Sequence, residues 1–162
     1  ASPNRPTSRG WIKLRSSNPD KDPIIQFNYL ETEEDRLQMR DCIKIARDIF
    51  SQKSFQNYAG KELRPGNNVQ DNDVLDEIIR NTSDTAYHPS CTNKMGLDNM
   101  AVVDPETKVY GIDNLRVVDS SVMPDIVSGN LNASTIMIAE KISDMILGRE
   151  EEPIDLDFFK AA

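Results

Sequence analysis

The segment from Asn114 to Gly148 constrains the fold more than any other part of this sequence. Its apolar run Leu115–Val118 predicts a short strand. The strand is followed by a loop that contains Met123 and a proline. A long helix then begins near Asn132 and ends at Gly148, a residue suited to a left-handed C-cap. Three charged residues interrupt the apolar stretch of this helix, so it is not a membrane span. The segment therefore predicts a strand–loop–helix unit.

The first part of the chain predicts a hairpin followed by a helix. Trp11–Arg15 alternates apolar and polar residues, and Pro23–Tyr29 offers a second strand after a turn. Thr32 provides an N-cap oxygen and Asp35 stands at the capping-box position, so we expect a helix from there. Apolar residues at three- and four-residue spacing over about five turns predict a helix face packed in the core: Met39, Cys42, Ile43, Ala46, Ile49 and Phe50.

The middle of the chain predicts loops and one short helix. Lys61–Asn68 contains Pro-Gly and is expected to be a loop. Asp71 caps a short helix with four apolar residues, Val74, Leu75, Ile78 and Ile79. A second apolar run, Ala101–Val103, precedes a turn at Asp104–Thr107.

Composition and charge exclude several kinds of function. The 162 residues are 38% hydrophobic and 28% charged, as in ordinary globular proteins. The net charge of −8 argues against a nucleic-acid partner, because phosphate binding needs clustered lysine and arginine. The four basic residues among the first sixteen are interpreted as a solvated, flexible end rather than a phosphate-binding patch.

The cysteine and histidine content argues against a metal site. Cys42 and Cys91 lie far apart and form no CxxC motif. The chain contains a single histidine, and these three residues cannot complete a usual zinc site. We expect two reduced thiols and hence a cytoplasmic location, with peripheral attachment to a membrane as the alternative.

His88 is the only histidine in the chain. It lies in a loop between Tyr87 and Pro89, ahead of three small residues that leave room for a ligand over the imidazole. Histidine can accept a proton near neutral pH, because its unperturbed pKa is about 6.5. From the residues alone, a structural role and a role as a base stay equally open.

The start of the last helix is rich in hydrogen-bonding side chains. Asn130 and Asn132 stand at its entrance, and Ser134 and Thr135 lie in its first turn. Free backbone N–H groups and the positive end of the helix dipole make such a start suitable for negative charge. The same residue types are ordinary capping residues, and spacing alone favours capping.

Several motifs in a fixed order give a more specific indication. Residues 88–96 read H-P-S-C-T-N-K-M-G, and residues 114–124 read N-L-R-V-V-D-S-S-V-M-P. S-G-N follows at 128–130 and T-I-M-I-A-E-K at 135–141. Together with segments 15–19 and 28–30, these motifs resemble the closing region of the glucose–methanol–choline (GMC) oxidoreductases, above all its choline-oxidising members. The resemblance covers residues 9–148.

The resemblance implies an α+β fold with a mainly antiparallel sheet and helices packed on one face. Residues 9–113 are then a portion of the substrate-binding domain, and residues 114–148 return to the FAD domain as a strand and helix. Residues 149–162 are an acidic tail. The N-terminal FAD-binding domain is expected to be absent from this chain, since the sequence holds no GxGxxG fingerprint.

The resemblance also implies catalytic roles for two residues. His88 acts on the substrate hydroxyl and Asn130 assists it, while hydride passes from the substrate carbon to the flavin. A neutral imidazole can accept the hydroxyl proton, and an amide N–H can stabilise the oxygen.

Four further residues are implied to bind FAD. Asp119 and Ser120 approach its phosphates and ribityl chain, and Asn132 and Ala133, at the helix cap, lie by the flavin pyrimidine. Two departures from the family pattern occur outside these positions: Asn93 stands where many relatives have Cys, and Ser134 where many have Pro.

We therefore expect part of an FAD-dependent oxidoreductase that converts choline to betaine aldehyde. The isolated chain is expected to be inactive and to bind FAD negligibly. The expected partners are choline, the missing FAD domain and, through exposed apolar surface, a second copy of the chain in a homo-oligomer. The alternatives are another GMC alcohol dehydrogenase or oxidase, and a non-enzymatic binding module on the same scaffold.

Overall fold

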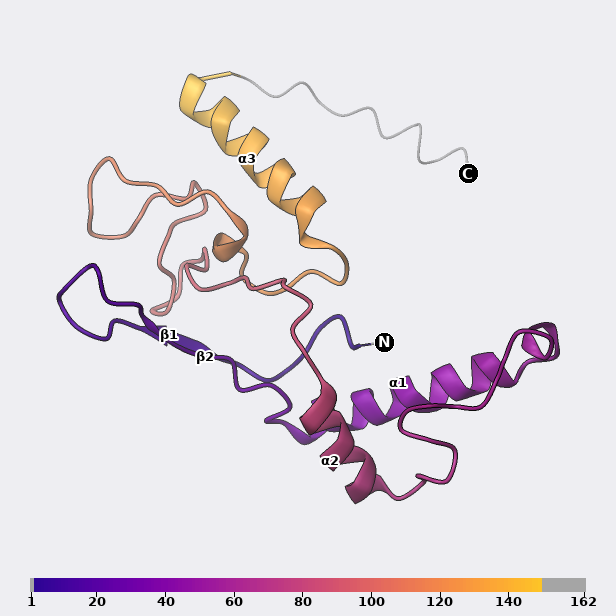
Figure 1. The fold of residues 1–162 in the computed structure, drawn as a ribbon. Coiled ribbons are helices and arrows are strands. Elements are labelled where there is room, and N and C mark those ends of the chain that lie inside the picture. Colours follow the sequence, from indigo (N-terminus) through magenta and orange to yellow (C-terminus); the bar gives the residue numbers. More distant parts are fainter. Residues whose placement is uncertain (1, 150–162) are drawn as a thin grey trace, which may run out of the picture. The chain divides into compact units, whose positions relative to one another are not determined.

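The structure is a computed structural model that describes residues 2–149 (Figure 1). The chain divides into two compact units, one ending at Tyr87 and one beginning at His88. The predicted acidic tail lies outside the described residues, apart from residue 149. The predicted boundary between residues 113 and 114 concerns the division of a longer enzyme and stays a prediction.

An antiparallel hairpin opens the first unit, as predicted (Figure 1). Its strands, β1 (Trp11–Lys13) and β2 (Ile24–Gln26), pair Trp11 with Gln26 and Lys13 with Ile24. The second strand is shorter than predicted because Asn28, with φ of 55°, has left the extended region.

Helix α1 (Glu33–Ser51) begins where the sequence predicts, since the Thr32 hydroxyl accepts a hydrogen bond from the Asp35 N–H at 3.3 Å. The other half of the capping box does not form. The Asp35 carboxylate instead accepts hydrogen bonds from the N–H groups of Thr7 and Ser8, at 2.7 and 2.9 Å. Asp35 thus ties the N-terminal segment to α1, and it is 2% exposed.

The apolar stripe of α1 is less buried than predicted. Its first four residues are half-buried, whereas Ile49 and Phe50 are exposed, and the fully buried residues of α1 are Asp35 and Arg40. The prediction of a core face is therefore wrong for the last turns. There the rings of Phe50 and Phe55 pack edge to face, Phe55 belonging to the short 3-10 helix η1 (Lys53–Phe55).

Helices α1 and α2 (Asn72–Thr82) meet around a buried arginine. Arg40 is paired with Glu33 at 3.0 Å and with Asp76 of α2 at 3.2 Å. As predicted, Asp71 caps α2, and its carboxylate accepts hydrogen bonds from the N–H groups of Asp73 and Val74 in the first turn. The apolar face of α2 buries Leu75 and Ile79, as expected for a short amphipathic helix.

The predicted loop at 61–68 is folded around one side chain. The Arg47 guanidinium donates to both oxygens of Glu62, at 3.0–3.2 Å, and to the carbonyl oxygens of Gly66 and Val69. The Glu62 carboxylate also accepts the Gly66 N–H at 3.1 Å. A bidentate arginine therefore gives this irregular segment its shape.

The second unit consists of bridged loops, the 3-10 helix η2 (Ser120–Val122) and helix α3 (Leu131–Leu147). The sequence predicts a strand at 115–118 and an apolar run at 101–103. In both places the structure has isolated bridges, Met95 with Val103 and Lys108 with Arg116 among them. The turn at 104–107 is confirmed, with the Thr107 N–H bonded to the Asp104 carbonyl at 2.8 Å. The core of the second unit holds five buried apolar residues: Val103, Val122, Met123, Leu131 and Ile142.

Helix α3 ends as predicted at Gly148, whose φ of 66° is the left-handed conformation of a C-cap. The described residues thus combine helices with a small antiparallel sheet, in agreement with an α+β class. No helix among them is long and apolar enough to cross a membrane. Both cysteines are free, as expected.

Candidate functional site

The loop that carries His88 is held along η2. Three alternate N–H groups, at residues 91, 93 and 95, donate to the three successive carbonyl oxygens of η2, with N···O distances of 3.3, 2.9 and 2.8 Å. The side chains join as well, since the Asn93 amide donates to the Ser121 hydroxyl at 2.9 Å. Two segments about thirty residues apart are therefore joined by hydrogen bonds of backbone and side chains.

His88 is half-buried at the start of this loop. Within residues 2–149, no hydrogen bond or ion pair is recorded for its imidazole, which leaves both ring nitrogens available to a ligand. Cys91, three residues on, has φ of 69°, a left-handed conformation that costs a non-glycine residue about 1 kcal/mol or more. The loop therefore holds a shape that its residues do not favour on their own.

Asp119 and Ser120 lie beside that loop. Asp119 is exposed and is the N-cap of η2, because its Oδ1 accepts the Ser121 N–H at 2.7 Å. The Ser120 hydroxyl is half-buried and donates to the Pro89 carbonyl oxygen at 3.4 Å. These two predicted cofactor-binding residues thus share a hydrogen-bonded framework with the predicted base.

The start of α3 differs in detail from the prediction. Asn130, not Asn132, is the N-cap, and its side chain makes no capping hydrogen bond. Asn132 and Ala133 are the second and third residues of the helix and are exposed. The assignment of Asn132 to the cap is therefore wrong by two residues, because the loop turns into the helix earlier than the sequence predicts.

This helix start is suited to an electronegative ligand. Its first turn holds no acidic residue, and the Thr135 hydroxyl donates to the Leu131 carbonyl oxygen instead of accepting from an N–H group. The Asn130 side chain does not cap the backbone N–H groups of the first turn. These groups lie at the positive end of the dipole of a 17-residue helix. Electron-rich ring atoms, such as those of a flavin pyrimidine, fit such a start.

All six predicted site residues lie in the second unit, but the structure joins them to different degrees. Hydrogen bonds connect the His88 loop with Asp119 and Ser120, and α3 packs against η2. In the described part of the chain, no hydrogen bond links His88 with Asn130. Sequence reasoning missed the Asn93–Ser121 contact, although an amide two residues after Cys91 was a signal for a polar partner.

A groove of about 350 Å³ lies next to this framework, within the size range of small-molecule sites. It is mostly apolar, and its lining residues come from the His88 loop, the residues after η2 and α3; they include Met95, Met123, Pro124, Ser134, Met137 and Lys141. An apolar wall of this kind can exclude water from a neighbouring polar site.

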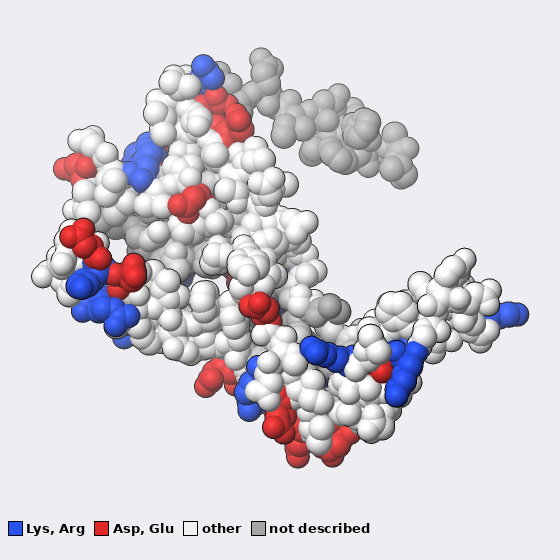
Figure 2. Space-filling view, viewed as in Figure 1, with Lys and Arg blue, Asp and Glu red and all other residues white. Residues whose placement is uncertain are grey.

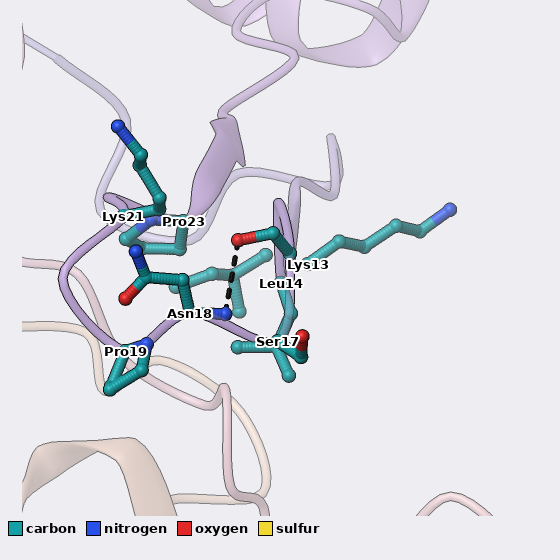
Figure 3. Close-up of a pocket in the computed structure, with 9 residues that line it drawn as sticks. Lys13, Leu14, Ser17, Asn18, Pro19, Lys21 and Pro23 are labelled. Carbon is teal, nitrogen blue, oxygen red and sulfur yellow. Dashed lines mark hydrogen bonds between the residues drawn. The ribbon is translucent and has the colours of Figure 1, made fainter.

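The first unit has a hollow at the turn between β1 and β2 (Figure 3). Its walls are turn residues such as Asn18, Pro19 and Pro23, with Lys13 and Lys21 directed outward, and the Asn18 N–H is bonded to a serine hydroxyl at 3.2 Å. It contains none of the predicted site residues. We therefore place the candidate site in the second unit.

Charged side chains of both signs occur on the surface of the described residues. On the face drawn in Figure 2, lysine and arginine occur in small groups next to acidic residues, between wide uncharged areas, and form no broad basic patch. Near the His88 loop, Lys94 contacts Asp98 at 2.8 Å, and this hydrogen bond lowers the pKa of Asp98. Residues 2–149 contain no group of three histidine, cysteine or acidic side chains that could hold a metal ion.

Comparison with known proteins gives consistent matches. The sequence model of the family described as GMC oxidoreductase matches residues 6–139. Human mitochondrial choline dehydrogenase is 56% identical over 149 residues, which are 91% of this chain and 25% of that protein. An oxygen-dependent choline dehydrogenase from Acinetobacter baumannii is 54% identical over 92% of this chain and 27% of its own length.

Solved structures have a similar fold. Pyridoxine 4-oxidase, described as from Mesorbium loti, superimposes with a TM-score of 0.84 at 30% identity, over 91% of this chain and 29% of that one. The chain thus spans about a quarter of the length of the curated relatives that it matches.

Proposed function

Because this chain belongs to the GMC oxidoreductase family, we propose that it is the C-terminal part of an FAD-dependent enzyme that oxidises choline to betaine aldehyde. Identities of 54–56% to choline dehydrogenases over about nine-tenths of the chain support this substrate. The activity belongs to the whole enzyme, since the chain spans about a quarter of its relatives.

One observation carries the proposal. Three backbone hydrogen bonds and one between side chains hold the loop of the only histidine along η2, beside Asp119 and Ser120. The loop of His88 is thereby held next to the exposed Asp119 and the half-buried Ser120, and acid–base chemistry on a bound substrate requires a base beside polar groups of this kind.

His88 and Asn130 would act on the substrate oxygen. An imidazole nitrogen of His88 accepts the hydroxyl proton, and the Asn130 amide donates a hydrogen bond to the oxygen as negative charge develops there. Asn130 is exposed and its side chain is not used for capping, so the amide is available for this purpose. FAD, when bound, supplies the acceptor for the hydride that leaves the carbinol carbon.

Two parts of the chain would hold FAD. The exposed Asp119 carboxylate suits the hydroxyl groups of the ribityl chain, which donate hydrogen bonds, better than it suits phosphates of the same charge. Its Oδ2 takes no part in the cap of η2. Ser120 lies next to it, and the backbone at Asn132 and Ala133 would donate to the flavin pyrimidine from the uncapped start of α3.

The larger sheet of the substrate domain belongs to the same proposal. In the described part of the chain, β1 and β2 form a two-stranded sheet, and all six of their residues are exposed. A sheet edge of this kind needs further strands or a cover. We assign these strands to a mainly antiparallel sheet with helices on one face in the whole enzyme. A homo-oligomer and a cytoplasmic location likewise remain predictions.

The test is flavin reduction in the full-length enzyme. Choline, benzyl alcohol and glucose would be mixed anaerobically with the enzyme in a stopped-flow instrument, and the bleaching of oxidised flavin followed. We expect choline to reduce the flavin fastest. Faster reduction by benzyl alcohol or glucose points to another GMC alcohol dehydrogenase or oxidase, and no reduction by any alcohol points to a binding module.

A further inference from the structure

The contact between the His88 loop and η2 combines a repetitive backbone pattern with a single specific side-chain pair. The N–H groups at residues 91, 93 and 95 that donate to η2 alternate along the loop, as in an extended strand. Because only alternate N–H groups of the loop bond to η2, these backbone bonds alone fit more than one register. A slip of two residues along η2 would keep the same kind of bonds and move His88 by about 6–7 Å.

Ser121 is the residue of η2 with most connections to both sides. Its N–H donates to Asp119 Oδ1 at 2.7 Å, its carbonyl oxygen accepts the Asn93 N–H at 2.9 Å, and its hydroxyl accepts from the Asn93 amide at 2.9 Å. Asn93 and Ser121 are both half-buried, which protects the side-chain bond from competing water.

The same segment is anchored on its other edge. The Gly96 N–H donates to the Val103 carbonyl oxygen at 3.1 Å, and Val103 is fully buried, as is Val122 of η2. The left-handed backbone of Cys91 lies between His88 and this anchored part. Such a conformation persists where the surrounding contacts determine it. The position of His88 therefore follows from where residues 91–95 sit on η2.

We propose that Asn93 and Ser121 are positioning residues, whose side-chain hydrogen bond sets the register of the His88 loop on η2 and thereby the place of the imidazole relative to Asp119 and Ser120. The inference rests on the proposed function, because it concerns the same site. It assigns a role in the reaction to two side chains outside the six predicted site residues.

The experiment uses a matched pair of variants in the full-length enzyme, Ser121→Thr and Ser121→Val. Threonine and valine have nearly the same shape, so the two variants differ only in the hydroxyl that accepts from Asn93. We expect Ser121→Thr to reduce flavin with choline within about twofold of the natural rate constant. We expect Ser121→Val to be slower by about tenfold or more, since misplacement of a reacting group by about 1 Å can cost two orders of magnitude.

Three controls separate positioning from a loss of stability. The limiting rate constant of flavin reduction should fall in Ser121→Val, whereas the Kd for choline, the FAD content and the melting temperature should match those of Ser121→Thr. Asn93→Ala should reproduce the defect, and Ser121→Val added to Asn93→Ala should slow the reaction no further, because the bond is already absent.

Each outcome bears on one of the two proposals. Equal rate constants for the Thr and Val variants, or additive effects of Ser121→Val and Asn93→Ala, overturn the positioning role. If the Ser121→Val enzyme does not fold, Asn93→Ala decides instead. A rate constant of Asn93→Ala equal to that of the natural enzyme would also overturn the positioning role. If His88→Ala reduces flavin normally in parallel, the proposed function fails instead.

Discussion

Replacement of Asp35 by asparagine should detach the N-terminal segment from α1. The buried carboxylate accepts three hydrogen bonds, from the N–H groups of Thr7 and Ser8 and from the Thr7 hydroxyl, at 2.7–3.0 Å. Asparagine keeps one oxygen but presents an NH₂ group in place of the other. At least one part-buried N–H then faces another donor, so the change is not conservative here.

The structure gives two estimates of the size of this effect. An unsatisfied buried donor costs about 1–3 kcal/mol, and the loss of the charge weakens the remaining bonds, which together predict a loss of about 2–4 kcal/mol at pH 7. Burial raises the pKa of Asp35, but hydrogen bonds from Ser8 and Thr7 outweigh it and lower the pKa to about 2 from 3.8. At 1.36 kcal/mol per unit, that difference corresponds to about 2 kcal/mol.

The pKa shift also fixes the direction of the pH dependence. Because the folded pKa lies below the unfolded one, the carboxylate stabilises the fold above about pH 4. This contribution is lost as the pH falls from about 4 to about 2. The natural chain should therefore lose its advantage over Asp35→Asn in that window, since asparagine does not titrate.

Urea unfolding followed by the fluorescence of Trp11, the only tryptophan, measures both effects. Asp41→Asn is the matched control, because it removes the same charge from an exposed position of α1 and should change stability by less than about 0.5 kcal/mol. A loss below about 1 kcal/mol for Asp35→Asn at pH 7, or a difference from the natural chain that stays constant down to pH 2, would refute the reasoning.

Three further predictions concern the packing of the first unit and the start of α3. Gly10→Ala should destabilise the hairpin by about 1–3 kcal/mol in urea unfolding, since the new Cβ would lie 2.3 Å from a β2 carbonyl oxygen, whereas Gly60→Ala, with open space around it, should be neutral. Arg47→Lys should speed amide hydrogen exchange in residues 62–69, because lysine cannot replace a bidentate guanidinium; unchanged exchange would contradict this. In the full-length enzyme, Asn130→Ala should slow flavin reduction more than Asn132→Ala does, and the opposite order would show that the assignment of Asn130 is wrong.

Local signals predicted the helix boundaries well. Thr32, Asp71 and Gly148 each act on backbone groups within four residues along the chain, so the sequence nearby contains all that their capping geometry needs. The same holds for the turn at 104–107, where one aspartate arranges the following N–H groups.

Contacts between distant residues were predicted less well. Asp35 had the right spacing for a capping box, but donors 27 and 28 residues away took its carboxylate. The stripe of α1 indicated burial by period alone, while the actual contact with α2 depends on Arg40 and its pair with Asp76. Spacing does not show where a loop turns into a helix, so the sequence predicts the cap at Asn132, whereas the structure has it at Asn130. These outcomes depend on three-dimensional competition for partners, which periodicity does not report.

The most direct test of the central claim is flavin reduction by choline in the full-length enzyme with His88 replaced by alanine. The imidazole is half-buried, and no hydrogen bond is recorded for it in residues 2–149, so its removal should leave FAD content and stability near normal. We predict that the limiting rate constant of reduction in stopped flow falls by about a hundredfold or more, the usual scale for a lost acid–base group. A rate constant equal to that of the natural enzyme would contradict the account.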